Sequence, residues 1–409
     1  MRGLNKDYWL YWVASSASMA ASNILQYVLS LYVLELTGSA TIFASVLSII
    51  IFPRLLLTPI AGVIADRVKK MTFMSWIVLG EAVVLGAYCL LGQRFTIELV
   101  WIYILVIVLE IGEIFYNGPA AAILPELVPK DKIKDAIAVS KVDDGIVVVI
   151  APMAAAVIYE NLSLSLAFGM IAFLNFLAFL LQKCIHPKYA VQQVENGKKQ
   201  SFMTDFKQGL EAIRENSFLR IFIRILPVVD AFFASTFSVC VMYLLREVFE
   251  LSAYTYGMYC TVTASMSMIV PMFAVPVVKK YPAGKIFWIS TMLIAIELAG
   301  IGALAFAGVK GILPITTVVV GITVLDCMTI AEAIPMQMSS STLLQTNVQQ
   351  EVLGRVSSVV RLVATVAVAL GEMLFGYLND AINVWCPIFI GAIGVGIAAL
   401  LYKKYFEKL

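Results

Sequence analysis

The amino-acid sequence predicts an all-α membrane protein whose twelve transmembrane helices form two pseudo-symmetric six-helix bundles. Hydrophobic side chains account for 61% of the 409 residues and charged ones for only 14%, whereas soluble domains are about a quarter charged. Twelve apolar stretches reach the length of about 20 residues that a helix needs to cross a hydrocarbon core of about 30 Å. One long polar segment leaves six of these stretches on each side.

Helices are the only secondary structure that these stretches permit. A membrane-spanning strand would alternate apolar with polar residues and close into a barrel, and the sequence has no such alternation. The first stretch is also too long for the apolar region of a signal peptide. We expect spans at 8–34, 41–65, 72–92, 99–120, 136–159, 164–184, 217–245, 254–278, 286–307, 312–338, 356–379 and 385–403.

The polar segment divides the chain into an N-terminal bundle at 1–184, a central loop at 185–216 and a C-terminal bundle at 217–409. Within the loop, "FMTDFKQGLEAI" places apolar residues three or four positions apart, which predicts a short amphipathic helix on the inner membrane face. Lys and Arg concentrate in the loops on the side of the N-terminus, and only Arg94, Arg246 and Lys310 lie in loops on the other side. This distribution places both termini in the cytoplasm.

The two halves resemble one another when the second is shifted by 220 residues against the first. Val128 then aligns with Val348, Lys141 with Arg361, Met153 with Met373 and Glu160 with Asp380. A base at the same depth of a membrane helix in both halves is unusual, because buried charges are costly. We infer two parallel six-helix repeats.

Several short stretches resemble a known family. The loop after the second span reads G-x-x-x-D-R-x-x-K ("GVIADRVKK"), and with the twelve spans it resembles the major facilitator superfamily. The stretches "LELTGSAT", "PRLLLTPIAGVIADR", "FYNGPAAAILPELVP" and "GLEAIRENSFLR" resemble its macrolide-efflux and enterobactin-exporter branch. The resemblance implies a transporter that works by alternating access.

The same resemblance implies a latch in the loop after the second span. Gly62 would let this helix approach the eleventh, and Asp66 would interact with the positive N-terminal end of that helix near Gly354. Arg67 and Lys70 would hold carboxylates or lipid phosphates. The alternative is that these charges only fix the orientation of the loop.

Ten acids fall within the expected spans, and few bases accompany them. Because the resemblance implies that helices 1, 4, 7 and 10 line the cavity, the candidates for binding substrate or protons are Glu110, Glu113, Asp230, Asp326 and Glu332. The spacing of Glu110, Glu113 and Asn117 places all three on one face of a helix. Alternatively, some of these acids are permanently protonated or ion-paired structural groups, the interpretation that we favour for Glu81 and Glu297.

Basic residues in the spans suggest a charge network. Lys141 and Asp144 share a helix face and can neutralise one another. Arg361 lacks a local partner and could pair across the domain interface with Asp143 or with an acid of helix 10. Static pairing and gating are both open. Arg54 lies too deep to reach water easily, so we expect it to meet an acid from helix 4 or 11.

The fifth span, "GIVVVIAPMAAAVI", resembles a degraded form of a pattern found in exporters of the superfamily. In that pattern small residues let helix 5 pack against helix 8. Gly145, Ala151 and Pro152 occupy the corresponding positions, and Pro152 removes one backbone hydrogen bond. Generic packing of small residues is the alternative.

These features predict a proton-coupled exporter, or antiporter, of amphiphilic and cationic small molecules such as drugs or macrolides. The excess of acids motivates the cation, and the lack of a P-loop sequence argues against ATP. The alternatives are uptake or facilitated transport of a metabolite, siderophore or lipid, and a non-transporting sensor.

We expect a monomer in the cell membrane whose partners are substrate, protons and lipid. No sequence feature points to an enzyme, a cofactor, a metal site or nucleic acid binding.

Overall fold

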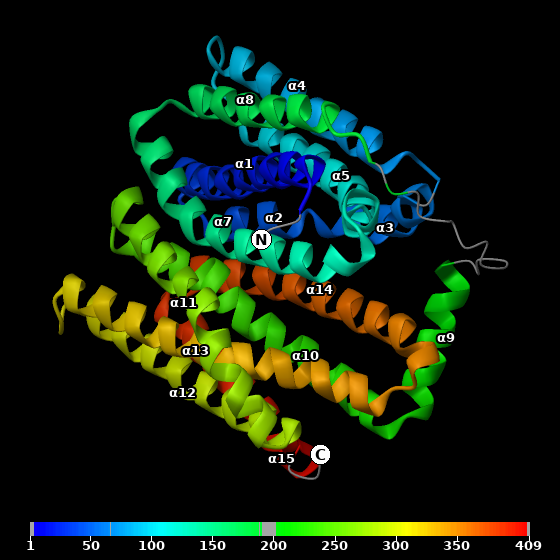
Figure 1. Ribbon diagram of the computed structural model, residues 1–409. Helices are drawn as coiled ribbons and strands as arrows, with labels where there is room; N and C mark the ends of the chain where they lie inside the picture. Colours follow the sequence, from blue (N-terminus) through cyan, green and yellow to red (C-terminus); the bar gives the residue numbers. More distant parts are fainter. Residues whose placement is uncertain (1–3, 66, 188, 190–201, 407–409) are drawn as a thin grey trace. The chain divides into compact units, whose positions relative to one another are not determined.

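The computed structural model describes residues 4–65, 67–187, 189 and 202–406 (Figure 1). The regular elements in these ranges are helical throughout. They are α1 (Lys6–Thr37), α2 (Ala40–Ser48), α3 (Ile51–Ala65), α4 (Lys70–Gly92), α5 (Leu99–Ala122), α6 (Leu124–Leu127), η1 (Lys130–Lys132), α7 (Ile133–Asn161), α8 (Leu164–Lys183), α9 (Phe202–Glu215), α10 (Ser217–Ser235), η2 (Thr236–Val241), η3 (Leu244–Val248), α11 (Ala253–Lys280), α12 (Ala283–Val309), α13 (Ile315–Asn347), α14 (Gln350–Ala381) and α15 (Trp385–Phe406).

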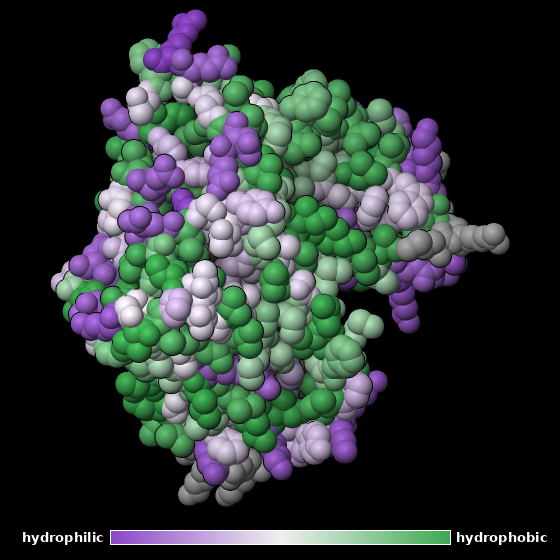
Figure 2. All heavy atoms as spheres, turned by 90° about the vertical axis from the view of Figure 1, so that its left-hand side faces the viewer, coloured by the Kyte–Doolittle hydropathy of each residue, from purple (hydrophilic) through white to green (hydrophobic). Residues whose placement is uncertain are grey.

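The helices match the twelve expected membrane spans. Eleven helical stretches among the described residues are long and apolar enough to cross a bilayer, and α15 supplies a further apolar stretch at Trp385–Leu401. Large hydrophobic side chains remain exposed on them, among them Met272 and Phe273, and hydrophobic residues cover much of the face shown in Figure 2. Such broad apolar exposure fits a surface in contact with lipid. The chain is a multi-pass membrane protein.

The second span is broken, although the sequence predicts one helix at 41–65. It consists of α2 and α3, separated by a turn at Ile49 and Ile50. Pro53 lacks the N–H that would donate to the carbonyl of Ile49, and Phe52 N donates to that carbonyl instead, at 3.3 Å. A proline near the start of α3 therefore explains the break.

The seventh span also departs from a regular α-helix. After α10 the backbone forms two π-helical segments, η2 and η3. Such segments are rare and occur preferentially at functional sites. The first of them, η2, contains two hydroxyl side chains, Thr236 and Ser238.

The described residues form two compact units. Unit 1 comprises those within 1–33, 49–197 and 253–261, and unit 2 those within 34–48, 198–252 and 262–409. Each unit thus contains most of one predicted bundle and a short segment of the other half of the sequence. The predicted boundary at 185–216 stays a prediction.

Each unit has its own tightly packed core. In unit 1, Tyr8, Met74, Leu127 and Val128 form a buried cluster, and α4 packs along α8. In unit 2, α12 packs along α13 and α15, and these helices can be followed in Figure 1.

The amphipathic helix predicted in the central loop is present as α9, which belongs to unit 2. Gly209 lies so close to α14 that a Cβ atom there would come within 2.9 Å of the Arg355 carbonyl oxygen. The absent side chain lets the two helices meet. The stretch before it, 190–201, lies outside the described residues.

Candidate functional site

In unit 1, the buried acid Glu110 on α5 meets Arg54 on α3. Arg54 Nε donates to Glu110 Oε1, and Arg54 Nη2 donates to Oε2 at 3.1 Å. The side chain of Glu110 is 5% exposed and that of Arg54 is 39% exposed. Two parallel hydrogen bonds fix the geometry of the pair, and the pair gives a buried acid its counter-charge. The contact expected between Arg54 and an acid of helix 4 is therefore present.

The other polar groups near this part of α5 are held by amides. Asn117 Nδ2 donates to Glu113 Oε1 at 3.5 Å, which confirms that they share a helix face, and Glu113 is exposed. Glu81 on α4 accepts a hydrogen bond of 3.4 Å from Asn175 on α8. A Cβ atom on Gly112 would lie 2.8 Å from Glu81 Oε1, so the glycine leaves room for this carboxylate.

The charges at the start of the fifth span are satisfied locally. Lys141 and Asp144 form an ion pair of 2.7 Å within α7, as their spacing predicts. Asp143 accepts a hydrogen bond of 2.6 Å from Ser16 on α1. The interfacial pairing proposed for Arg361 stays a prediction.

Unit 2 places three acids at the interface of α12 and α13. Glu332 Oε2 accepts a hydrogen bond of 2.9 Å from Ser290. Glu297 is 7% exposed, and its Oε2 atom has no hydrogen-bond partner among the described residues. Asp326 is buried, and Asp326 and Glu332 are electrostatic neighbours of Glu297. None of the ion pairs between described residues includes Glu297 or Glu332.

Two further acids of unit 2, Glu372 and Asp230, lie near the π-helical segment η2. Glu372 on α14 accepts hydrogen bonds from Ser238 at 3.1 Å and Ser48 at 3.4 Å. Ser238 belongs to η2, so the irregular backbone presents a donor to this carboxylate. Asp230 lies in α10 shortly before η2 and is half-buried.

Two acids at helix ends cap other helices in a similar way in the two units. Asp380 at the end of α14 accepts from Ser39 Oγ at 2.6 Å and from the backbone N–H groups of Ala40 and Thr41, each at 2.9 Å. Glu160 at the end of α7 accepts from Tyr254 N at the start of α11 at 2.8 Å. Each carboxylate satisfies N–H groups that a helix start leaves free.

Close helix packing accompanies both caps. A Cβ atom on Gly257 of α11 would lie 2.6 Å from the Cβ of Ala156 on α7, and one on Gly376 of α14 would lie 2.6 Å from that of Ala44 on α2. Ala156 and Gly376 are related by the 220-residue shift of the sequence repeat. In the pair of α7 and α11, the alanine lies on α7 and the glycine on α11. In the pair of α14 and α2, the glycine lies on α14, which corresponds to α7 in the repeat, and the alanine lies on α2.

The structure places the remaining predicted residues as follows. Asp66 lies outside the described residues, and Gly62 and Arg67 are exposed, so the latch stays a prediction. Lys70 forms an ion pair with Glu126 of α6. In the fifth span, Ala151 and Pro152 are buried, and the Pro152 carbonyl oxygen lies 3.1 Å from a Cβ built on Gly257. Gly145 is half-buried.

Sequence reasoning did not assign roles to Asp380, Glu160 or Ser238. The alignment of Glu160 with Asp380 was the available signal for the two caps, because both end a long helix at the same point of the repeat. Nothing in the sequence signals the π-helical turn that presents Ser238.

Long apolar helices that carry buried acids and a buried ion pair are typical of membrane proteins that move ions or solutes. The sequence profile of the Major Facilitator Superfamily matches residues 11–372. The chain belongs to this family, and the expected fold class is confirmed.

Relatives agree with this assignment. Macrolide efflux protein A of Streptococcus pyogenes is 24% identical over 216 residues, which cover 51% of each chain, so the chain spans about half the length of the curated relatives it matches. Solved structures similar in fold include the nucleoside transporter NupG, with a TM-score of 0.74 and 12% identity over 98% of this chain and 99% of the other. A bacterial homologue of the lysosomal transporter Spinster has a TM-score of 0.73 and 14% identity over 99% and 98%.

Proposed function

We propose that the protein exports amphiphilic, cationic small molecules in exchange for protons, by alternating access. The observation that carries this proposal is the pair of acids Glu297 and Glu332 between α12 and α13, and for Glu297 the proposal departs from the structural role that the sequence favours. A carboxylate without a cation is costly inside a membrane, so such a group binds a proton or a cationic ligand. Competition between the two for one acid would couple substrate release to proton entry.

The similarity to a macrolide efflux protein supports the choice of export and of an amphiphilic substrate. The contrast within the chain supports the choice of acids. Arg54 already neutralises Glu110, so that pair is better suited to holding helices together than to exchanging protons. Glu113 is exposed and accepts a hydrogen bond from Asn117, and it is a second candidate for contact with substrate.

The caps formed by Asp380 and Glu160 support alternating access. Each joins the end of one long helix to the start of another, at a contact of glycine with alanine. Contacts of this kind can be made and broken as a unit, because carboxylate, N–H groups and close backbone packing lie together. We propose that both are closed in one state of the transport cycle and open in another.

The proposal is tested with purified protein in liposomes that carry an imposed pH gradient and a radiolabelled macrolide. We expect uptake into inverted vesicles that depends on the gradient, and loss of that dependence in Glu332→Gln. Glu98→Gln, which changes an acid outside the spans, should behave as wild type. Transport that ignores the gradient would disprove proton coupling, and movement only down the substrate gradient would favour facilitated passage.

A further inference from the structure

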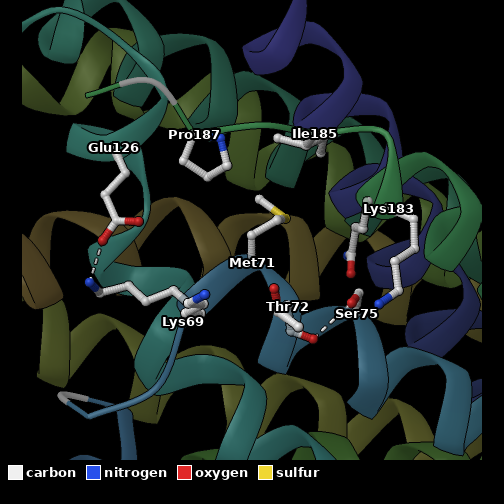
Figure 3. A pocket seen from close by; sticks show the side chains of 10 residues that line it. Lys69, Met71, Thr72, Ser75, Glu126, Lys183, Ile185 and Pro187 are labelled. Carbon is white, nitrogen blue, oxygen red and sulfur yellow. Dashed lines mark hydrogen bonds and ion pairs between the residues drawn. The ribbon is translucent and has the colours of Figure 1, made fainter. Parts of the chain in front are cut away.

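A cavity of about 290 Å³ lies at one end of unit 1. It is formed by the start of α4, by Glu126 of α6, by the end of α8 and by the segment that follows α8 (Figure 3). Its polar lining includes Lys69, Lys70, Thr72, Ser75, Gln182 and Lys183. The proposed transport cycle uses none of these side chains.

The cavity is electropositive. Lys70 is neutralised by Glu126, but Lys69 and Lys183 line the same cavity without forming an ion pair with any described residue. The cavity also lies at the N-terminal end of α4, a helix of 23 residues whose N-cap residue Lys69 makes no side-chain cap. Backbone N–H groups of a first helical turn attract anions, and phosphate groups in particular.

An independent observation indicates that the ligand also carries a hydrogen-bond donor. Gln182 is 1% exposed, its Nε2 atom faces the hydroxyl of Tyr116 at 3.5 Å, and its Oε1 atom has no partner among the described residues. A buried amide oxygen without a hydrogen bond is costly. A ligand that brings a hydrogen-bond donor to this acceptor would remove that cost.

The surroundings favour a lipid over a soluble phosphate. The ammonium group of Lys183 lies 4.5 Å from the ring centroid of Trp76, and Trp76 is 57% exposed on α4. Phe176 and Phe179 of α8 continue this aromatic surface. Exposed tryptophan beside lysine is typical of the membrane interface, where lipid headgroups lie.

We propose that this cavity binds the headgroup of an anionic phospholipid that carries a free hydroxyl, as phosphatidylglycerol does. The phosphate lies against Lys69, Lys183 and the first turn of α4, and the hydroxyl donates to Gln182 Oε1. The acyl chains run along Trp76 and Phe176. The shared chemistry is a phosphate ester with a nearby hydroxyl, which soluble glycerol phosphate also offers.

Native mass spectrometry of the full-length protein from nanodiscs tests this proposal. Wild type should retain phosphatidylglycerol over phosphatidylcholine, and Lys69→Gln/Lys183→Gln should retain it about tenfold less, because two basic contacts are lost. Lys134→Gln, which removes a base outside the cavity, is the matched control. Circular dichroism shows whether each variant is folded.

The variant Gln182→Leu tests the contact with the headgroup hydroxyl independently of the contacts with the phosphate. It should abolish the preference for phosphatidylglycerol over phosphatidylethanol, an anionic phosphodiester without a headgroup hydroxyl, and should keep the preference for both over phosphatidylcholine. Equal retention of phosphatidylglycerol by wild type and the double lysine variant would overturn the proposal. Displacement of the lipid by equimolar glycerol phosphate or inorganic phosphate would assign the site to a soluble anion and overturn the lipid assignment.

Discussion

The buried acids of the two units have different kinds of partners. In unit 1, Glu110 has a guanidinium partner in Arg54, and Glu81 is held by Asn175. In unit 2, Glu332 is held by the hydroxyl of Ser290, and Glu297 keeps one oxygen without a partner among the described residues. Glu81 and Glu297 occupy comparable helices of the two halves, so the contrast is not one of position. Among the described residues, Glu110 of unit 1 thus has a basic partner, whereas Glu297 and Glu332 of unit 2 form no ion pair. The proposed exchange of protons assigns the variable charge to the acids of unit 2.

Removing Arg54, the basic partner of Glu110 in unit 1, should have the largest effect on stability. Arg54→Gln leaves Glu110 buried without its counter-charge, and we expect the free energy of unfolding to fall by about 3 kcal/mol. Chemical unfolding in detergent micelles, followed by tryptophan fluorescence, measures this change. Arg67→Gln, an exposed arginine of the same unit, is the control.

The double variant Arg54→Gln/Glu110→Gln sharpens this result, because it removes both charges. Its stability should return to within about 1 kcal/mol of wild type, as expected when a buried pair is replaced by neutral groups. If the single and double variants are equally destabilised, Arg54 contributes by packing rather than by charge.

Filling the space beside Glu81, the acid that Asn175 contacts, should have a smaller effect on stability. Gly112→Val places atoms where the Glu81 carboxylate lies, and displacement of Glu81 from Asn175 should cost about 1 to 2 kcal/mol. Thermal unfolding of the purified variant detects the loss. Gly86→Val on α4 is the matched control, since a Cβ atom there meets nothing within 4 Å. Equal losses of stability in Gly112→Val and Gly86→Val would show that the effect comes from replacing a helical glycine and not from displacing Glu81.

Removing the hydroxyl donor of unit 2 should cost less again. Ser290→Ala deletes the hydrogen bond to Glu332, and we expect a loss of about 1 kcal/mol in unfolding free energy. Ser267→Ala is the control, because its hydroxyl bonds only to a backbone carbonyl of its own helix. A loss as large as that of Arg54→Gln would contradict the distinction between the units.

Neutralising Glu332 of unit 2 should have the smallest effect on stability. The amide of Glu332→Gln can still accept from Ser290, so the unfolding free energy should change by less than about 0.5 kcal/mol. Transport driven by a pH gradient should nevertheless be lost in liposomes. A destabilised variant that keeps coupled transport would reverse the roles assigned to the two units.

The sequence was sufficient for the fold class, because apolar length and charge determine which segments cross a membrane. It was also sufficient for contacts set by helical spacing, such as Lys141 with Asp144, and for the need of Arg54 to find an acid. It was insufficient where partners are remote in the chain. Ser290 meets Glu332 only because α12 packs along α13, and Asp380 reaches Ala40 from 340 positions away.

The sequence also could not predict the irregular backbone. The pattern at 217–245 is equally apolar in α and π conformations, so the π-helical turn around Ser238 has no signature of its own. Pro53 lies inside the second expected span, but a proline near a helix start can be tolerated, so its presence alone does not predict a break. Only the hydrogen bonds of Ile49 and Phe52 distinguish a break from a continuous helix.

The turn at Ile49 and Ile50 also coincides with the position where the chain passes from unit 2 to unit 1. The corresponding passage, between Thr261 and Val262, lies inside the uninterrupted helix α11. A turn that lacks a helical hydrogen bond bends at a lower energetic cost than the interior of a helix. The two passages, which lie on corresponding helices of the repeat, therefore differ in the regularity of their local backbone.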